Sequence, residues 1–151
     1  IPISAVAGAG LNELMAEIAA NIPETGYKFY PDEMSSDQPE RFIVREIIRE
    51  QILNLTSEEV PHSVAILIDE FKETKTLLRV TASIVMERES QKGIIIGAKG
   101  AMIKTIGIKA REKMESIFGS KVFLELFVRT NKNWRQSASL IKRMGYDKDT
   151  Y

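Results

Sequence analysis

The stretch Ser90-Gln-Lys-Gly-Ile-Ile-Ile-Gly97-Ala-Lys99-Gly100-Ala-Met-Ile-Lys104-Thr-Ile-Gly107 is the most informative part of the chain. Its apolar pattern predicts two helices, with Gly97 and Gly100 bracketing a tight turn and Lys99 at the tip of that turn. Glycine lets the backbone bend sharply and leaves room for a close approach. The second helix would present free N–H groups and the positive end of its dipole. The stretch therefore predicts a turn that could bind phosphate.

Two familiar nucleotide-binding loops do not fit this stretch. A P-loop needs Gly-x4-Gly-Lys-Ser/Thr, and neither that spacing nor that run occurs here. The spacing of Gly93, Gly97 and Gly100 also differs from the Gly-x-Gly-x-x-Gly fingerprint of dinucleotide-binding folds. A helix–turn–helix corner that needs glycine for its geometry alone remains an alternative.

Hydrophobic periodicity on either side of the stretch predicts the remaining elements. We expect helices at 11–21, 40–55, 90–96, from 100 or 101 to 118, and 134–144, and strands at 63–72, 78–86 and 121–129. The polar connection at 72–76 predicts that the first two strands pair as an antiparallel hairpin, and the second strand alternates with a period of two. The third strand is expected to place Val122, Leu124, Leu126 and Val128 on one face. Asp37 and Glu40 have the spacing of a capping box, and Ser90 could cap the helix that follows it. Inward-facing residues expected in the long second helix are Met102, Ile103, Ile106, Ala110, Met114 and Ile117. The result is an α+β domain with three strands and its helices on one face.

Charge and composition exclude several functions. The chain has no cysteine and one histidine, so neither a thiolate site nor a histidine cluster is available, and we expect no metal site and no catalytic residue. The net charge is zero, but residues 24–70 hold 11 acidic and 4 basic side chains, whereas residues 88–113 hold 7 basic and 2 acidic ones. Such segregation can create a positive face.

No apolar run suggests a membrane span or a signal peptide, so we expect a cytoplasmic protein.

The run Ile-Ile-Ile-Gly97-x-Lys99-Gly100, the basic helix after it and the order of the strands together match the KH signature. The Gly-x-x-Gly loop of KH domains clamps the backbone of single-stranded RNA. A helix and two strands precede the loop and one strand follows it, which resembles the type II arrangement (α-β-β-α-α-β). That resemblance implies an RNA-binding domain.

Nearly the whole chain resembles the C-terminal region of the Era family of bacterial GTPases. The residues that carry this resemblance lie in ranges 38–50, 56–63, 87–97 and 121–126, in Trp134-Arg135, in 145–147, and in the opening Ile-Pro-Ile-Ser-Ala5 with Gly8-Ala-Gly-Leu-Asn-Glu-Leu14. It implies a remnant of a GTPase domain at 1–22, a linker at 23–37 and a type II KH domain with a C-terminal helix at 38–148.

The same resemblance implies a function. The expected ligand is single-stranded RNA near the 3′ end of the small-subunit ribosomal RNA, bound during assembly of the small subunit. GTP and magnesium are expected for the parent chain and not for this fragment, in which Ser4 and Ala5 would retain only a backbone contact to guanine. A monomer, with peripheral membrane association of the parent protein, is also expected.

The candidate RNA-binding residues are Lys92, Ile94, Ile95, Ile96, Gly97, Ala98, Lys99, Gly100, Lys104, Lys109 and Arg111. Gly97 and Gly100 would admit the phosphate backbone and the basic residues would neutralise it. The three isoleucines, with the strand near Val85, would contact bases.

Other interpretations stay open. Hydrolysis of GTP would belong to the parent chain. A protein-docking domain would use an acidic surface formed by Glu46, Glu50, Glu58 and Glu59. Trp134, Phe123 and Phe127 could contact RNA or pack within the protein.

Overall fold

The computed structural model describes residues 1–23, 39–56, 63–137 and 141–142, and it separates the chain into two compact units, Ile1–Asp37 and Gln38–Tyr151. In the first unit a turn, closed where the Ser4 N–H donates to the Ala9 carbonyl at 3.0 Å, leads into helix α1 (Leu11–Asn21). The predicted bounds of this helix are confirmed. None of its side chains is buried.

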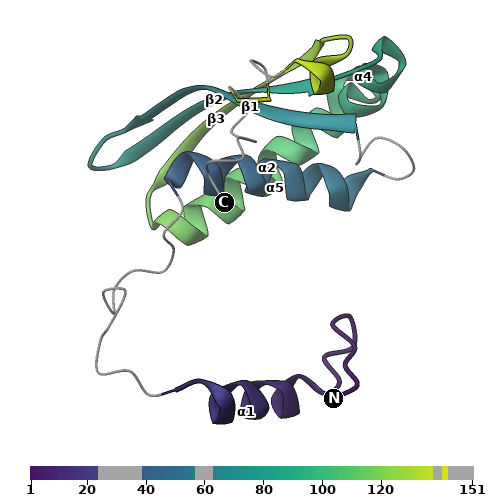
Figure 1. The fold of residues 1–151 in the computed structure, drawn as a ribbon. Coiled ribbons are helices and arrows are strands. Elements are labelled where there is room, and N and C mark those ends of the chain that lie inside the picture. The colour runs from purple at the N-terminus through teal and green to yellow at the C-terminus, as the bar shows by residue number, and fades with distance from the viewer. Residues whose placement is uncertain (24–38, 57–62, 138–140, 143–151) are drawn as a thin grey trace. The chain divides into compact units, whose positions relative to one another are not determined.

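The second unit has the predicted α+β architecture (Figure 1). Its elements are α2 (Glu40–Leu55), β1 (Val64–Glu73), β2 (Leu77–Met86), α4 (Glu89–Ile96), the 3-10 turn η1 (Ala98–Gly100), α5 (Ala101–Phe118), β3 (Lys121–Thr130) and the 3-10 turn η2 (Trp134–Gln136).

The three strands form one mixed sheet in the order β1-β2-β3. β1 and β2 form the predicted antiparallel hairpin, with a bulge between Ile68 and Glu70. β3 runs parallel to β2, because α4 and α5 form the crossover that parallel strands require. As the central strand, β2 is more buried than its alternating sequence predicts, since Ser83 and Val85 on its second face are also covered.

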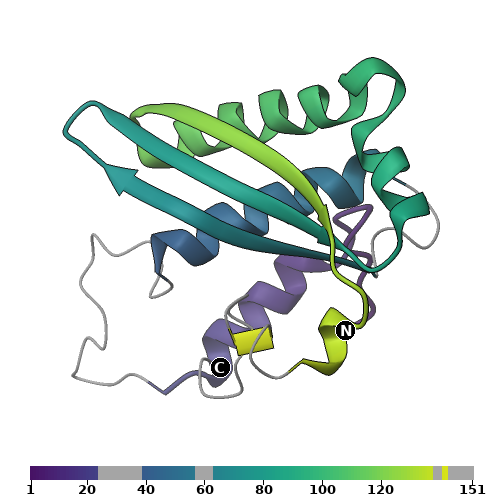
Figure 2. The same ribbon diagram turned by 90° about the horizontal axis from the view of Figure 1, so that it is seen from above.

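The core lies between the sheet and the two long helices. α2 and α5 cover the same face of the sheet (Figures 1 and 2). Ile48 and Ile52 of α2 and Ile106 of α5 are completely buried in this core. Full burial of one such side chain contributes about 1.5–3 kcal/mol, so this layer dominates the stability of the unit.

A second, smaller apolar cluster lies on the opposite face of the sheet. Trp134 packs there against Ala65 and Val85, with Leu67 at its margin. The indole is 8% exposed, so it belongs to the protein interior. The expectation that Val85 contacts bases is therefore wrong, because Trp134 and Ala65 cover it.

Three local expectations are corrected. α4 is capped by Arg88 and begins one residue before Ser90. Ile117 is 51% exposed because the last turn of α5 instead directs Phe118 against the core. The helix expected at 134–144 does not begin at Trp134, because the chain forms η2 and then becomes extended at Ser137. Ile141 and Lys142 are helical, while 138–140 and 143–151, like Asp37, lie outside the described residues.

Within the described residues, no helix combines the length and the apolar character needed to cross a membrane.

Candidate nucleic-acid interface

The turn between α4 and α5 has a backbone that favours glycine. Gly97 and Gly100 have φ values of 71° and 80°, and Lys99 between them has φ 52°. A Cβ on Gly97 would lie 2.7 Å from the Cβ of Met102, so glycine is required there for space as well as for conformation. At Gly100 a Cβ would meet nothing within 4 Å, and only the positive φ favours glycine. Ala98 and Lys99 are exposed at the tip of the turn.

α4 holds this turn in place from the N-terminal side. Ile95 is fully buried in the main core, and the buried Gln91 accepts a hydrogen bond from the Arg88 N–H at 3.1 Å. At the start of the helix, Glu89 accepts hydrogen bonds from the Thr130 hydroxyl and from Lys92. These bonds, the one from Thr130 first, lower the pKa of the Glu89 carboxyl below its usual range. The helix is thus anchored to both the core and the end of β3.

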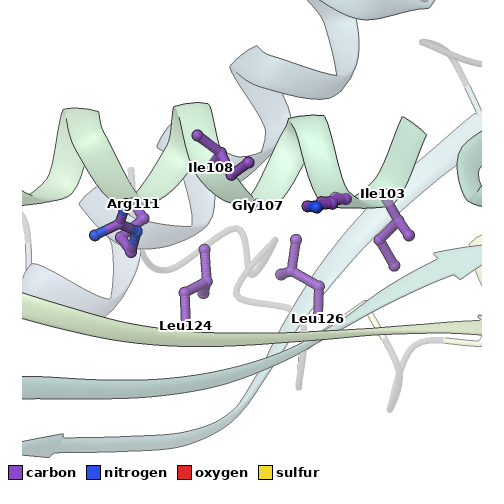
Figure 3. Close-up of a pocket in the computed structure, with 7 residues that line it drawn as sticks. Ile103, Gly107, Ile108, Arg111, Leu124 and Leu126 are labelled. Atoms are coloured by element: carbon purple, nitrogen blue, oxygen red, sulfur yellow. The ribbon is translucent and has the colours of Figure 1, made fainter. Parts of the chain in front are cut away.

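A groove lies between α5 and β3. Its lining begins in the first turn of α5, directly after the turn at Gly97–Gly100. It has a volume of about 350 Å³ and is lined by Ile103, Lys104, Gly107, Ile108, Arg111, Leu124 and Leu126. Figure 3 shows Leu124 and Leu126 rising from β3 toward α5, with Arg111 at one end of the row and Ile103 at the other. The walls are apolar and carry two cationic side chains, a combination suited to a base with its attached phosphate.

β3 adds backbone groups to the same groove. In the described sheet it pairs with β2 on one side, so its other edge is a row of N–H and C=O groups beside the groove. Such groups can hydrogen-bond to the edge of an unstacked base. Gly107 leaves this part of the groove without a side chain, and a Cβ there would make ordinary van der Waals contact with the Cδ1 atom of Leu126 at 3.7 Å.

Arg111 is held at its end of the groove by a carboxylate. Glu115 Oε1 accepts from Arg111 Nη1 at 3.2 Å and also from the Val122 N–H at 3.1 Å. The second bond ties the carboxylate to the start of β3. Glu115 therefore fixes the position of Arg111 relative to both walls.

The structure brings together only part of the predicted site. Lys104 and Arg111 line the groove, whereas Lys109 is exposed on α5 outside the groove lining and Lys92 pairs with Glu89 on α4 at 3.2 Å. Ile94 is 50% exposed and Ile96 is half-buried. The prediction that Ile95 offers its side chain to bases is wrong, because the helical period turns it into the core, where it is 0% exposed.

Sequence reasoning missed most of the apolar groove. Ile103 is expected to face inward from its helix, and Leu124 and Leu126 are expected on one face of their strand without a functional role. Gly107 and Ile108 carried a signal that could have been used, since a glycine beside an outward-facing isoleucine on a basic helix is unusual for a purely solvated surface. Phe123 and Phe127, left open above, are 41% and 48% exposed.

The N-terminal turn contains the predicted Ser4 and Ala5, and in it the Ala7 N–H donates to Ser4 Oγ at 3.3 Å.

Among the described residues, no group of three or more His, Cys, Asp or Glu side chains is placed to hold a metal ion.

Comparison with known proteins identifies the domain that carries the groove. A family model described as KH domain matches residues 59–135, about half of the chain. The chain belongs to the KH domain family. The turn at 97–100, α5 and β3 all lie within the matched KH segment.

The KH domain and the N-terminal unit together are similar to known GTPases. The chain is 51% identical over 150 residues to GTPase Era of Rippkaea orientalis, which covers 99% of this chain and 48% of that protein. It is 49% identical to GTPase Era of Syntrophus aciditrophicus over 97% of this chain and 48% of the relative. The chain thus spans about half the length of these relatives.

Solved structures agree with this similarity. An Aquifex aeolicus Era variant bound to GDP and AlF4− superposes with a TM-score of 0.86 at 41% identity, covering 97% of this chain and 49% of that one. Era in complex with MgGDPNP and nucleotides 1506–1542 of 16S ribosomal RNA gives the same score, identity and coverage.

Proposed function

We propose that this KH domain binds single-stranded RNA, with the turn at Gly97–Gly100 clamping the backbone and the α5–β3 groove receiving the bases. The observation that carries the proposal is the position of the turn at one end of a cationic, apolar-walled groove. Lys99 and Lys104 would neutralise phosphates, and the first turn of α5 would direct free N–H groups at them. Arg111 would supply a third cation, and Lys92 and Lys109 would add charge near the path.

We further propose the identity of the ligand and its setting. The ligand is a segment near the 3′ end of the small-subunit ribosomal RNA, longer than the roughly four nucleotides that a KH turn clamps. The solved Era complex with nucleotides 1506–1542 of 16S ribosomal RNA, at 41% identity, supports this choice. RNA binding would serve assembly of the small ribosomal subunit in the cytoplasm. The protein would act as a monomer, and the parent protein would associate peripherally with the membrane.

The N-terminal unit would belong to the GTPase domain of such a parent. Residues 1–22 would be the end of that domain, 23–37 a linker, and 38–148 the RNA-binding part. The backbone at Ser4 and Ala5 would face the guanine of a bound GTP. The remaining nucleotide and magnesium contacts would come from the part of the relatives that this chain does not span.

The protein-docking alternative gains no support from the described acidic residues. Glu46 is paired with Arg45 at 3.3 Å, and Glu50 is paired with Lys113 on α5. Glu58 and Glu59 lie outside the described residues. RNA binding is therefore the function that the geometry favours.

A titration with a 12-nucleotide single-stranded RNA matching the small-subunit 3′ end, at two salt concentrations, tests the proposal. The double variant Ala98→Asp with Lys99→Asp should bind at least tenfold more weakly, and binding by the unmodified chain should weaken with salt. The matched control is Lys75→Asp with Thr76→Asp, which makes the same change in charge at the exposed β1–β2 turn. Equal weakening by both double variants would mean that charge alone, and not the turn, governs binding.

A further inference from the structure

The two faces of β3 carry different apolar side chains. Leu124 and Leu126 point into the groove, whereas Phe123 and Phe127 lie on the face of the sheet away from α2 and α5, where they are 41% and 48% exposed. Trp134 covers the Ala65–Val85 end of that face. Among the residues that the structure describes, these two phenylalanine rings are therefore left largely exposed on a sheet whose other apolar positions are buried or partly buried.

Cationic side chains lie beside the exposed rings and at both ends of their row. Arg79, directly opposite Phe123 in the β2–β3 register, places its guanidinium 4.4 Å from the centre of the Phe123 ring. Lys121 and Arg129 are exposed at the two ends of the same row on β3. We refer to Arg79, Phe123 and Phe127 as the aromatic face.

The carboxylates among these residues each have a contact within the sheet, weakest at Glu125. Glu125, between the two rings, accepts a hydrogen bond from the Thr81 hydroxyl at 3.5 Å. Asp69 accepts from Ser83 and lies 3.8 Å from Arg129, and Glu70 pairs with Lys72. The guanidinium of Arg79 and the two rings thus remain as the groups available to a ligand.

We propose that the aromatic face is a second binding surface for single-stranded RNA, on which bases beyond those in the groove stack against Phe123 with its Arg79 and against Phe127. Phenylalanine rings and guanidinium planes are both surfaces on which unstacked bases lie. The inference deepens the proposed function and rests on it. It assigns a place to the part of the RNA that exceeds the groove.

The geometry of β3 connects the two surfaces. The groove and the aromatic face are the two sides of one edge strand, so an RNA that leaves the groove needs only to cross that edge. Phe123 and Phe127 are four residues apart, about 13 Å along a strand, which separates the rings enough for each to hold its own base. Charged residues alternate with the rings, whereas a protein-docking core would favour a continuous apolar patch.

Two RNAs distinguish this surface from the groove. Fluorescence anisotropy on the full chain would compare a 4-nucleotide RNA, sized for the groove, with the 12-nucleotide RNA. Phe123→Leu and Phe127→Leu keep an apolar side chain but remove the ring. Each should weaken binding of the 12-nucleotide RNA about tenfold, because stacking on one ring is worth roughly 1–3 kcal/mol per base. Binding of the 4-nucleotide RNA should change less than about twofold.

A third variant separates stacking from charge. Arg79→Lys keeps the positive charge and removes the planar guanidinium, so it should weaken binding of the long RNA while leaving its salt dependence unchanged. Circular dichroism would confirm that each variant is folded.

Unchanged binding of the 12-nucleotide RNA by the folded double variant Phe123→Leu with Phe127→Leu would overturn the inference and leave the face to a protein partner. Equal weakening of both RNAs would also overturn it. If the Ala98→Asp with Lys99→Asp variant binds normally while the phenylalanine variants do not, the groove proposal fails and the aromatic face stands. No binding of either RNA by the unmodified chain would reject both.

Discussion

Helices α1 and α2 have similar amphipathic sequences but very different surroundings. On α1, Leu11, Met15 and Ile18 are 37%, 63% and 41% exposed, and no residue of the helix is buried. On α2, Val44, Ile48 and Ile52 form a similar stripe at helical spacing and are each 0% exposed. The difference comes from the partners, since α2 packs against α5 and the sheet.

The comparison shows that an apolar stripe identifies which face of a helix tends to be buried. The stripe does not identify the element that buries it. In the 38–151 unit the sheet and α5 supply that cover. In the 1–37 unit the described residues leave the stripe of α1 open. Stability should therefore depend strongly on the stripe of α2 and weakly on that of α1.

The largest expected effect follows from this contrast. Ile48→Ala should lower the free energy of unfolding of the 38–151 unit by about 2–5 kcal/mol, because it opens a cavity in a fully packed layer. Met15→Ala removes a comparable volume from an exposed position on α1 and should change that free energy by less than about 0.5 kcal/mol. Urea unfolding followed by circular dichroism measures both. Similar losses for the two variants would show that α1 is also packed in solution.

The turns of the two units differ in the same way. Gly97 lies against Met102, which packs on the core, whereas a Cβ on Gly8 in the N-terminal turn would meet nothing within 4 Å. Gly97→Ala should destabilise the 38–151 unit by about 1–3 kcal/mol through positive φ and contact with Met102.

Gly119→Ala is the control for that variant, because Gly119 also has a positive φ, of 64°, with open space around it. It should cost only the backbone strain, about 1 kcal/mol. Unfolding midpoints that shift equally for Gly97→Ala and Gly119→Ala would show that Met102 yields and that space plays no part.

Much of the KH fold could be predicted because its local signals agree with its packing. The bounds of α2 followed from the period of its apolar residues, and the hairpin followed from two apolar runs around a polar turn. The turn at 97–100 was evident from its glycines. Lys99 was placed at the tip, although its positive φ could not be foreseen, since non-glycine residues rarely adopt it.

The groove could not be predicted because it depends on how two distant elements meet. Leu124 and Leu126 alternate as inward-facing strand residues do, and only in the folded unit do they lie half-buried beside α5 and form a wall of the groove. Ile95 was misassigned for the opposite reason. Three consecutive isoleucines look alike in sequence, but the rotation of about 100° between successive residues of a helix turns Ile95 into the core and leaves Ile94 outside.

A smaller effect concerns the ion pair that joins α2 to α5. Lys113 Nζ pairs with Glu50, and the two side chains are 42% and 43% exposed. Exposed pairs contribute little, so a double-mutant cycle with Lys113→Met and Glu50→Gln should give a coupling of about 0.2–1 kcal/mol that shrinks in high salt. A coupling above about 2 kcal/mol would mean that the packing of α2 against α5 in the 38–151 unit depends on this surface ion pair as well as on the core.

The smallest effect concerns the link that fixes α4. The Thr130 hydroxyl, and then Lys92, hold the pKa of Glu89 below its usual range. Because the folded-state pKa is lowered, this contribution to stability is complete above the unfolded pKa and is lost as the pH falls through the lowered value. Thr130→Val should raise the pKa of Glu89 toward the ordinary glutamate value, and Lys92→Met should raise it less, as measured by NMR titration of the Glu89 side-chain carboxyl carbon. In the unmodified chain, the protection factor of the Gln91 amide, which corrects for the intrinsic slowing of exchange in acid, should fall only as the pH drops through the lowered pKa of Glu89. A larger rise for Lys92→Met than for Thr130→Val would show that the ion pair, and not the bond to β3, anchors the helix that precedes the turn at Gly97–Gly100.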